Sequence, residues 1–264
     1  MSEQYVLETR NLVKEFKGFV AVDDVNLKVQ KGHIHALIGP NGAGKTTVFN
    51  LLTKFLIPTR GQILFKDQDI TTMKSAAIAR QGIVRSFQIS AVFPHMTALE
   101  NIRVALQTFE GTSFSFWKSG NSLHKLNQRC MELLDAVGLA EFANTTTVEL
   151  AYGRKRALEL ATTLAMEPEI LLLDEPTQGM GSEDVDRVVE LVRKAAAGRT
   201  VLMVEHNLSV VSKLCDRITV LAQGAVLTEG DYASVSADPR VREVYMGSDG
   251  SGERGTTADS EQSE

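Results

Sequence analysis

A glycine-rich turn at residues 39–46 carries the most specific chemical signal in the sequence. It reads GPNGAGKT and fits the pattern G-x-x-x-x-G-K-[ST] completely, after an apolar run and before a helical pattern. Glycines let backbone N–H groups wrap around a polyphosphate, and a helix start adds positive potential. We expect Lys45 to pair with phosphate oxygens and the Thr46 hydroxyl to ligate Mg²⁺. The residues expected to contact the phosphates are Gly39, Pro40, Asn41, Gly42, Ala43, Gly44, Lys45, Thr46 and Thr47.

An acidic pair follows the apolar run ILLL at residues 170–173. A buried strand would deliver Asp174 to its C-terminal end, where open α/β sheets bind ligands. We expect Asp174 to hold Mg²⁺, directly or through water, and Glu175 to orient or deprotonate an attacking water. Two solvated acids at a strand end are the simpler interpretation of the pair alone, but the glycine loop favours hydrolysis.

Further polar and aromatic residues extend this candidate site. Gln88 follows VRSF and can reach Mg²⁺ or the water, and His206 follows VLMVE and can donate to the γ-phosphate. A lone histidine is more often structural, but its place one strand after the acidic pair favours function. Phe16 lies about one strand pair before the glycine loop and either stacks on adenine or belongs to the core.

The stretch LAYGRKR at residues 150–156 resembles a second phosphate-binding turn. It places a glycine at a helix start with positive charge around it. Its expected ligand contacts are Ala151, Tyr152 and Gly153. A single domain has no evident need for two such turns.

The elements that must position these residues follow from apolar runs that alternate with helical patterns. This alternation predicts an α/β fold with a parallel sheet and crossover helices. The predicted strands span 6–12, 22–29, 33–39, 62–65, 83–88, 169–174 and 200–206, with a hairpin over 218–230 that turns at Gln223 and Gly224. The first two strands alternate apolar and polar residues, which is typical of antiparallel pairing.

Helices are expected over 44–54, over 154–166, and from Ser182, as the capping residue, to about Ala197. The pattern from about 90 to 166 is helical throughout. Thr97 and Glu100 form a capping box. One apolar stripe then ends at Gly138, and it comprises Leu123, Leu126, Cys130, Leu134 and Val137.

Composition limits the class of protein. With 264 residues, 43% of them hydrophobic, the chain can form a substantial core. It lacks an apolar run long enough to cross a bilayer, shows no signal peptide, and holds two cysteines that we interpret as buried thiols, Cys130 and Cys215.

The net charge of −5 comes mostly from the tail at 248–264, where five acids and one arginine give −4. The nearly neutral body argues against a nucleic-acid partner, and we expect the tail to be disordered.

The motifs, in this order and spacing, resemble an ATP-binding subunit of an ABC transporter over about residues 5–247. The resemblance implies a P-loop NTPase fold with a parallel-sheet core, an antiparallel β subdomain and a helical insertion at about 90–166. It implies ATP and Mg²⁺ as cofactors, transmembrane permease subunits, a second identical or paralogous ATPase subunit, and indirectly a solute-binding protein. The protein would lie peripherally on the cytoplasmic face of the inner (plasma) membrane.

In that family two subunits dimerise head to tail, so the turn at 150–154 would complete the partner's ATP site. This turn departs from the commonest signature, LSGGQ. Ala151 stands in place of serine, Tyr152 in place of glycine and Arg154 in place of glutamine, while Gly153 is kept. Gly181 replaces the aspartate usual in the loop after the acidic pair. These changes affect communication between the two sites more than ATP binding.

Within the family, the chain resembles branched-chain amino acid importers. The similar stretches are LAYG, FKGFVAVDDV (16–25), FPHMTALENI (93–102), VEHNLSVV (204–211) and DPRVREVYMG (238–247). The resemblance implies import of branched-chain or other apolar amino acids, with urea or short amides as the alternative.

Three rival classes fit the sequence less well. An ATPase acting on nucleic acid would usually carry a long coiled-coil insertion, and no sustained heptads are present. A tandem translation factor would hold two phosphate loops, and a small-molecule kinase would need an acceptor site but neither LAYGR nor His206. The aromatic segment 109–117 either packs on the helical insertion or covers a groove for a helix of the membrane partner.

Overall fold

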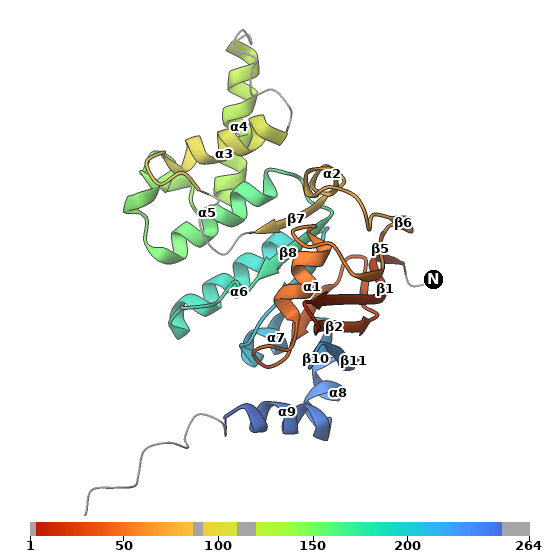
Figure 1. Cartoon of the computed structure of the whole chain (residues 1–264). Coiled ribbons are helices and arrows are strands. Elements are labelled where there is room, and N and C mark those ends of the chain that lie inside the picture. The colour runs from red at the N-terminus through yellow and green to blue at the C-terminus, as the bar shows by residue number, and fades with distance from the viewer. Residues whose placement is uncertain (1–3, 87–91, 110–119, 250–264) are drawn as a thin grey trace, which may run out of the picture.

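The computed structural model describes residues 4–86, 92–109 and 120–249. Its centre is a six-stranded sheet in the order β11-β10-β4-β9-β8-β7 (Figure 1). The strands are β4 (Ile34–Ile38), β7 (Ile83–Ser86), β8 (Ile170–Asp174), β9 (Thr200–Val204), β10 (Arg217–Ala222) and β11 (Ala225–Gly230). All neighbours pair in parallel except β11, which forms the predicted hairpin with β10. The parallel strands therefore direct their carboxyl ends to one edge, as the sequence predicted.

A second, antiparallel sheet packs on one face of the central sheet. Its strands are β1 (Tyr5–Phe16), β2 (Phe19–Val25), β3 (Lys28–Gln30), β5 (Arg60–Phe65) and β6 (Gln68–Asp69). The predicted strand at 22–29 is in fact two strands, because Asp24 has a φ of +50° and β3 leaves β2 to pair with the other end of β1. Helix α1 (Lys45–Leu52) lies between the two sheets.

Alternate side chains of the central strands point to opposite faces of the sheet and pack into two separate parts of the hydrophobic core. In β8, Ile170 and Leu172 pack towards α1 and the antiparallel sheet, while Leu171 and Leu173 pack towards the helices of the opposite face. Side chains two residues apart share one face of a strand, so a run of four apolar residues is buried on both sides. The covering helices are α5 (Tyr152–Leu164), α6 (Ser182–Ala196) and α7 (Leu208–Leu214).

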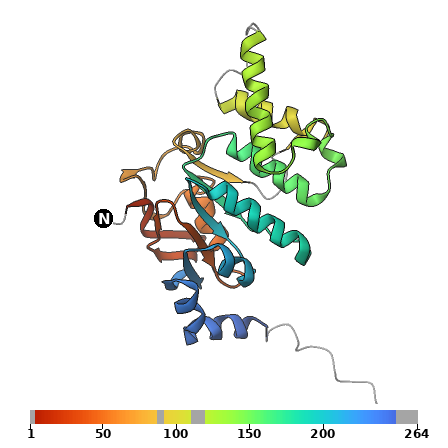
Figure 2. The same ribbon diagram turned by 180° about the vertical axis from the view of Figure 1, so that it is seen from behind.

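The helical insertion forms an arm that rises from the core (Figures 1 and 2). It contains α3 (Ala98–Phe109), α4 (Gly120–Ala136) and the start of α5, which pack on one another. The capping box is confirmed, because Thr97 N–H donates to Glu100 Oε2 at 2.8 Å and Glu100 N–H to Thr97 Oγ1 at 3.2 Å. Gly138 ends the α4 segment with a φ of +70°.

Several boundaries differ from the prediction. Helix α5 begins at Tyr152, two residues earlier than expected, and Gly181 rather than Ser182 is the capping residue of α6. Cys130 is buried as predicted, whereas Cys215, which follows α7, is only partly buried by its exposed surface. Burial raises the pKa of the Cys130 thiol to about 11 and that of the Cys215 thiol to about 12.

Three short or terminal helices were not predicted: α2 (Ser75–Arg80), α8 (Tyr232–Ala237) and α9 (Pro239–Asp249). Helix α9 reaches two residues into the predicted tail, and 250–264 lie outside the described residues.

Candidate nucleotide site

The glycine loop connects the end of β4 to the start of α1, and its backbone needs glycine. Gly39 and Gly44 have φ of +149° and +100°, and a Cβ at either would lie within 2.6 Å of a backbone oxygen, of Leu221 or Ala21. Gly42 has a φ of +80° but faces open space. Such conformations are strained for any side chain, so local chemistry dictates this loop. No side chain caps α1, which leaves its first N–H groups directed at a ligand.

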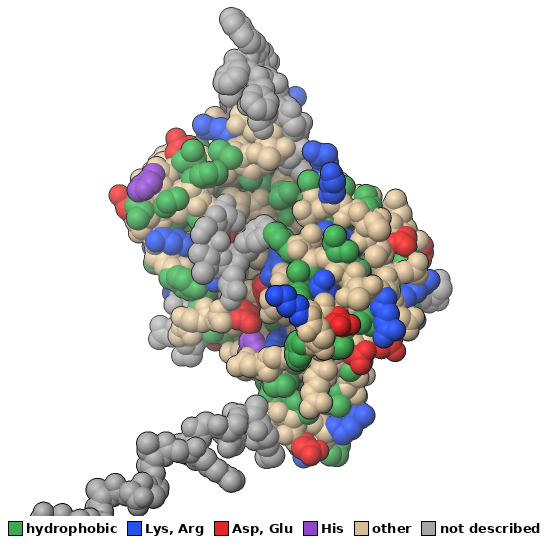
Figure 3. Space-filling view, in the orientation of Figure 1, with side chains coloured by type: hydrophobic (Ala, Val, Ile, Leu, Met, Phe, Trp, Pro, Cys, Tyr) green, Lys and Arg blue, Asp and Glu red, His purple; other side chains and the backbone are tan. Residues whose placement is uncertain are grey.

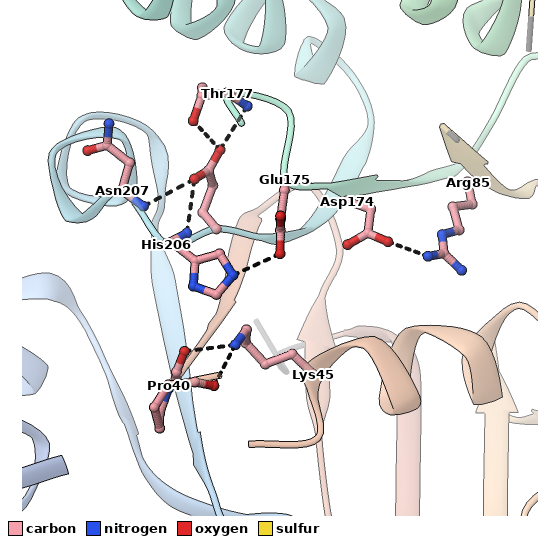
Figure 4. A network of polar contacts seen from close by, with 10 residues as sticks. Pro40, Lys45, Arg85, Asp174, Glu175, Thr177, His206 and Asn207 are labelled. Carbon is pink, nitrogen blue, oxygen red and sulfur yellow. Dashed lines mark hydrogen bonds and ion pairs between the residues drawn. The ribbon is translucent and has the colours of Figure 1, made fainter. Parts of the chain in front are cut away.

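Lys45 is buried at the start of α1, where its ammonium closes the loop. Its Nζ donates to Gly39 O and Pro40 O, each at 2.8 Å (Figure 4). Burial lowers the pKa of Lys45, and the nearby carboxylates of Glu175 and Asp174 oppose this shift. An anion that replaced the two carbonyl oxygens would be a stronger partner for the ammonium.

The acidic pair lies where the sequence predicted it, at the carboxyl end of β8. Asp174 is buried and forms an ion pair with Arg85 of β7. Glu175 follows with a φ of +48°, a conformation uncommon outside glycine, and its N–H donates to Val204 O at 3.0 Å. Its Oε1 lies 2.8 Å from Nε2 of His206. The structure thus brings Lys45, Asp174, Glu175 and His206 together at one edge of the sheet (Figure 4).

Glu205 is a site residue that the sequence analysis missed. Only 2% of it is exposed, yet its carboxylate accepts four hydrogen bonds. Oε1 accepts from Thr177 N–H at 3.1 Å and Thr177 Oγ1 at 2.6 Å, and Oε2 from the N–H groups of His206 at 3.0 Å and Asn207 at 3.2 Å. Glu205 therefore fixes the backbone that carries His206 to the loop after Glu175. Its position just after an apolar strand was the available signal, but nothing in the sequence marks it as buried.

The oxygen donors suit a hard cation such as Mg²⁺. Such ions are usually held by one or two carboxylates together with phosphate oxygens. Asp174 and the exposed Thr46 at the start of α1 offer this kind of donor set. In the part of the chain that the structure describes, no three His, Cys, Asp or Glu side chains gather into a metal site. Water and the phosphate oxygens of a nucleotide would supply the remaining ligands.

The second glycine turn begins α5 on the helical arm. Ala151 is the capping residue but offers no side-chain hydrogen bond, and Ala151 and Tyr152 are exposed. The Tyr152 hydroxyl donates to Gln178 O at 3.3 Å and accepts from Arg156 at 3.1 Å. The turn borders a cavity of about 360 Å³ lined by α6 and the end of the α4 segment, and none of residues 39–47 lines it. Gly153 thus lines a cavity that its own chain's phosphate loop does not border.

The remaining candidates are less well placed. Phe16 ends β1 with 40% of its surface exposed, and Lys14 Nζ lies 5.0 Å from its ring centroid. The ring is partly exposed, and its role in binding a base stays a prediction. Gln88 lies outside the described residues, as does most of the aromatic segment 109–117.

Sequence comparisons relate the chain to known proteins. The profile of the ABC transporter family matches residues 22–178, and that of the branched-chain amino acid ATP-binding cassette transporter C-terminal region matches 225–251. The high-affinity branched-chain amino acid transport ATP-binding protein BraF of Pseudomonas aeruginosa is 39% identical over 92% of this chain and 98% of its own length. LivG of Escherichia coli, of the same description, is 38% identical with the same coverage.

Solved structures agree with the fold. An ATP-binding cassette of an ABC transporter in its ADP conformation superposes with a TM-score of 0.80 and 29% identity, covering 92% of this chain and 99% of that one. A cassette in a dimeric post-hydrolysis state bound to ADP and Pi gives a TM-score of 0.72 and 26% identity, covering 86% and 98%. The match to the family profile over more than half of the chain, and to relatives along nearly their whole length, shows that the chain belongs to the ABC transporter ATP-binding family.

Proposed function

We propose that this chain is the ATP-hydrolysing subunit of an importer for branched-chain amino acids. The observation that carries the proposal is the cluster at the carboxyl edge of the central sheet, in which Glu175 and His206 face the loop that holds Lys45 (Figure 4). The solute is inferred from relatives, since both BraF and LivG are described as branched-chain amino acid transport proteins. No residue of an ATPase subunit needs to touch the solute.

In the proposed reaction the residues of the site bind the phosphates, hold the metal and activate the water. Lys45 would leave the two loop carbonyls and bind the β- and γ-phosphates. Thr46 and Asp174 would hold Mg²⁺, whose charge would stabilise the developing negative charge on the phosphates. Glu175 would orient the attacking water and accept its proton, and His206 would bind the γ-phosphate and contact Glu175. Gln88 would reach the metal or the water.

The site would be completed by a second copy or a paralogue. In a head-to-tail dimer, the N–H groups at the start of α5 would face the γ-phosphate on the partner, with Gly153 allowing close approach. Ala151 offers no hydroxyl for this contact, so the backbone would supply it. Hydrolysis would remove the bridging phosphate, and the two subunits would separate.

An apolar groove between the core and the arm offers a site for the permease. It has a volume of about 360 Å³ and is lined by residues of α2, β7, α3 and α5, among them Ala76, Ala79 and Ala105, and by Phe55 and Met166 outside these elements. Phe55 is 57% exposed there, and hydrophobic side chains surround this junction on the face seen in Figure 3. We assign the groove to a short amphipathic helix from the cytoplasmic side of the permease, because a transporter ATPase must transmit its motion to a membrane subunit.

The family membership and the structure together support peripheral attachment to the membrane. Within the described residues no helix combines the length and apolar character that a bilayer crossing requires. We place the subunit on the cytoplasmic face, held by the permease and acting indirectly with a solute-binding protein.

The decisive experiment is reconstitution. ATP turnover is measured for the purified chain alone and with permease and binding protein in vesicles, in the presence of leucine or urea. Stimulation by leucine but not by urea is expected. Stimulation by urea alone would favour a short-amide importer, and stimulation by DNA in place of the permease would contradict the proposal.

A further inference from the structure

Arg85 is a buried arginine that the proposed reaction does not use. It lies in β7 with 12% of its side chain exposed, and its guanidinium forms an ion pair with Asp174, of which 5% is exposed. Its other terminal nitrogen, Nη1, donates to Asn50 Oδ1 at 2.7 Å. One side chain thus connects β7 to the end of β8 and to α1, the helix that follows the phosphate loop.

Two aromatic rings hold the guanidinium in this position. Its Cζ lies 5.8 Å from the ring centroid of Phe49 in α1 and 6.0 Å from that of Phe55. Phe49 is fully buried, and both Phe55 and Arg85 line the apolar groove. An arginine that is bonded to a carboxylate and an amide oxygen, with two aromatic faces nearby, has little freedom to turn. The ion pair with Asp174 is therefore a fixed part of the site.

The ion pair lowers the free-energy cost of burying the Asp174 carboxylate when no cation is bound. A buried carboxylate is costly unless an opposite charge lies beside it, and arginine keeps its charge at every physiological pH. Arg85 contacts only Oδ2 of Asp174. The other carboxylate oxygen is turned away from Arg85, towards the side of Glu175 (Figure 4). A cation can therefore meet Asp174 without displacing Arg85.

We propose that Arg85 is the internal counter-ion and positioning residue of Asp174. It compensates the buried charge while no cation is bound, and it orients the carboxylate so that one oxygen meets Mg²⁺. The inference rests on the proposed function, because it requires Asp174 to face the magnesium of a bound nucleotide. It adds a residue that acts through Asp174 and touches neither nucleotide nor metal.

The inference predicts a stability defect that depends on Mg²⁺. In Arg85→Gln, Asp174 loses its counter-ion, and Mg²⁺ bound with ADP supplies a replacement charge. The melting temperature of Arg85→Gln should fall below that of the parent by on the order of 10 °C in ADP with EDTA. The deficit should shrink by several degrees in ADP with Mg²⁺. ADP is used because it avoids both turnover and ATP-driven dimerisation.

Arg156→Gln is the matched control. It breaks a pair of similar burial, Arg156 with Glu159 at 2.8 Å and 13% and 11% exposed, that does not involve Asp174. Its deficit should be the same with and without Mg²⁺. Arg85→Lys keeps the charge but loses the contact with two partners at once. It should show an intermediate deficit in melting temperature that still depends on Mg²⁺, and it replaces Arg85→Gln in the test if that variant does not fold.

The inference would be overturned if, for each Arg85 variant, the deficit in melting temperature were the same with and without Mg²⁺. Arg85 would then be a purely structural residue. A failure of ADP with Mg²⁺ to stabilise the parent protein would instead contradict the proposed function. The two failures are thus distinguishable in one set of melting curves.

Discussion

Nε2 of His206 lies 2.8 Å from Oε1 of Glu175, across the carboxyl ends of two neighbouring parallel strands. Glu175 reaches this position through a left-handed backbone conformation, and its N–H is held by Val204 O of the adjacent strand. Uncommon conformations of this kind persist where the surrounding structure enforces them, often at functional sites. The contact makes His206 a direct partner of the carboxylate that would activate water.

Glu175→Gln should retain ATP binding and lose turnover by roughly 10²–10⁴-fold, because the amide cannot accept the proton of the attacking water. Binding is measured with a fluorescent ATP analogue and turnover by phosphate release. ATP-bound dimer should accumulate in light scattering. Glu169→Gln, which changes an exposed acid just before β8, is the control. Normal turnover of Glu175→Gln would exclude Glu175 as the base.

Glu205→Gln should destabilise the fold. Glu205 accepts four hydrogen bonds, and an amide would place a donor against two of those donors. Leaving buried groups without partners costs about 1–3 kcal/mol, so urea unfolding should show a loss of this size. Turnover should also fall, because the loop that carries His206 loses its support. Unchanged stability would show that the carboxylate is not the acceptor that the geometry indicates.

The stability of the protein should decrease below neutral pH because of His35. This residue is fully buried in β4, and its Nε2 donates to Thr219 Oγ1 at 2.8 Å, since that hydroxyl donates onward to Glu229. Burial lowers the pKa of His35 from 6.5 to about 4, Glu229 opposes the shift, and Arg217 and His33 add to it. Between about pH 6.5 and pH 4, His35 therefore binds a proton in the unfolded chain but not in the folded protein.

The free energy of unfolding is therefore unaffected by His35 above about pH 6.5. It decreases by up to about 3 kcal/mol as the pH falls towards 4. Urea unfolding of the wild type and of His35→Gln at pH 7.5, 6 and 5 checks this expectation. The slope of stability against pH should be smaller in the variant. Identical slopes would mean that His35 does not titrate on unfolding.

Ala76→Glu should weaken coupling to the permease. Ala76 is exposed on α2 and lines the apolar groove, where a carboxylate would oppose docking of an apolar helix face. The ratio of permease-stimulated to basal ATP turnover should fall by on the order of tenfold, as a loss of about 1.4 kcal/mol of binding would produce. Ala233→Glu, an exposed change on α8, is the control. An unchanged ratio would move the docking site elsewhere.

Local signals in the sequence were sufficient for the phosphate loop and the acidic pair. Gly39 and Gly44 must be glycine for steric reasons, and the four apolar residues before Asp174 form a strand that is buried on both faces, as such a short apolar run favours. His206 was expected near the acidic pair because it ends the next parallel strand, and the structure places it 2.8 Å from Glu175, a contact that was not predicted. These features depend on few residues close in sequence.

The features that escaped prediction depend on contacts between distant residues. Arg85 meets Asp174, 89 positions away, and Glu205 meets Thr177, 28 positions away, so their burial cannot be read from neighbours in the chain. The cap of α6 was misplaced because serine is a strong capping residue, while the backbone turns one residue earlier, at Gly181. The division between β2 and β3 reflects which part of β1 each strand pairs with.

The central claim is that ATP is bound between two copies of this fold, with Gly153 of one facing the phosphates held by Lys45 of the other. Lys45→Ala should abolish nucleotide binding, and Gly153→Asp should block the contact from the partner by charge repulsion. Each variant alone should be inactive. An equimolar mixture contains dimers with one intact composite site, because Lys45 comes from one chain and Gly153 from the other. Recovery of ATP turnover in the mixture is the predicted result, and a mixture as inactive as either variant alone would contradict the account.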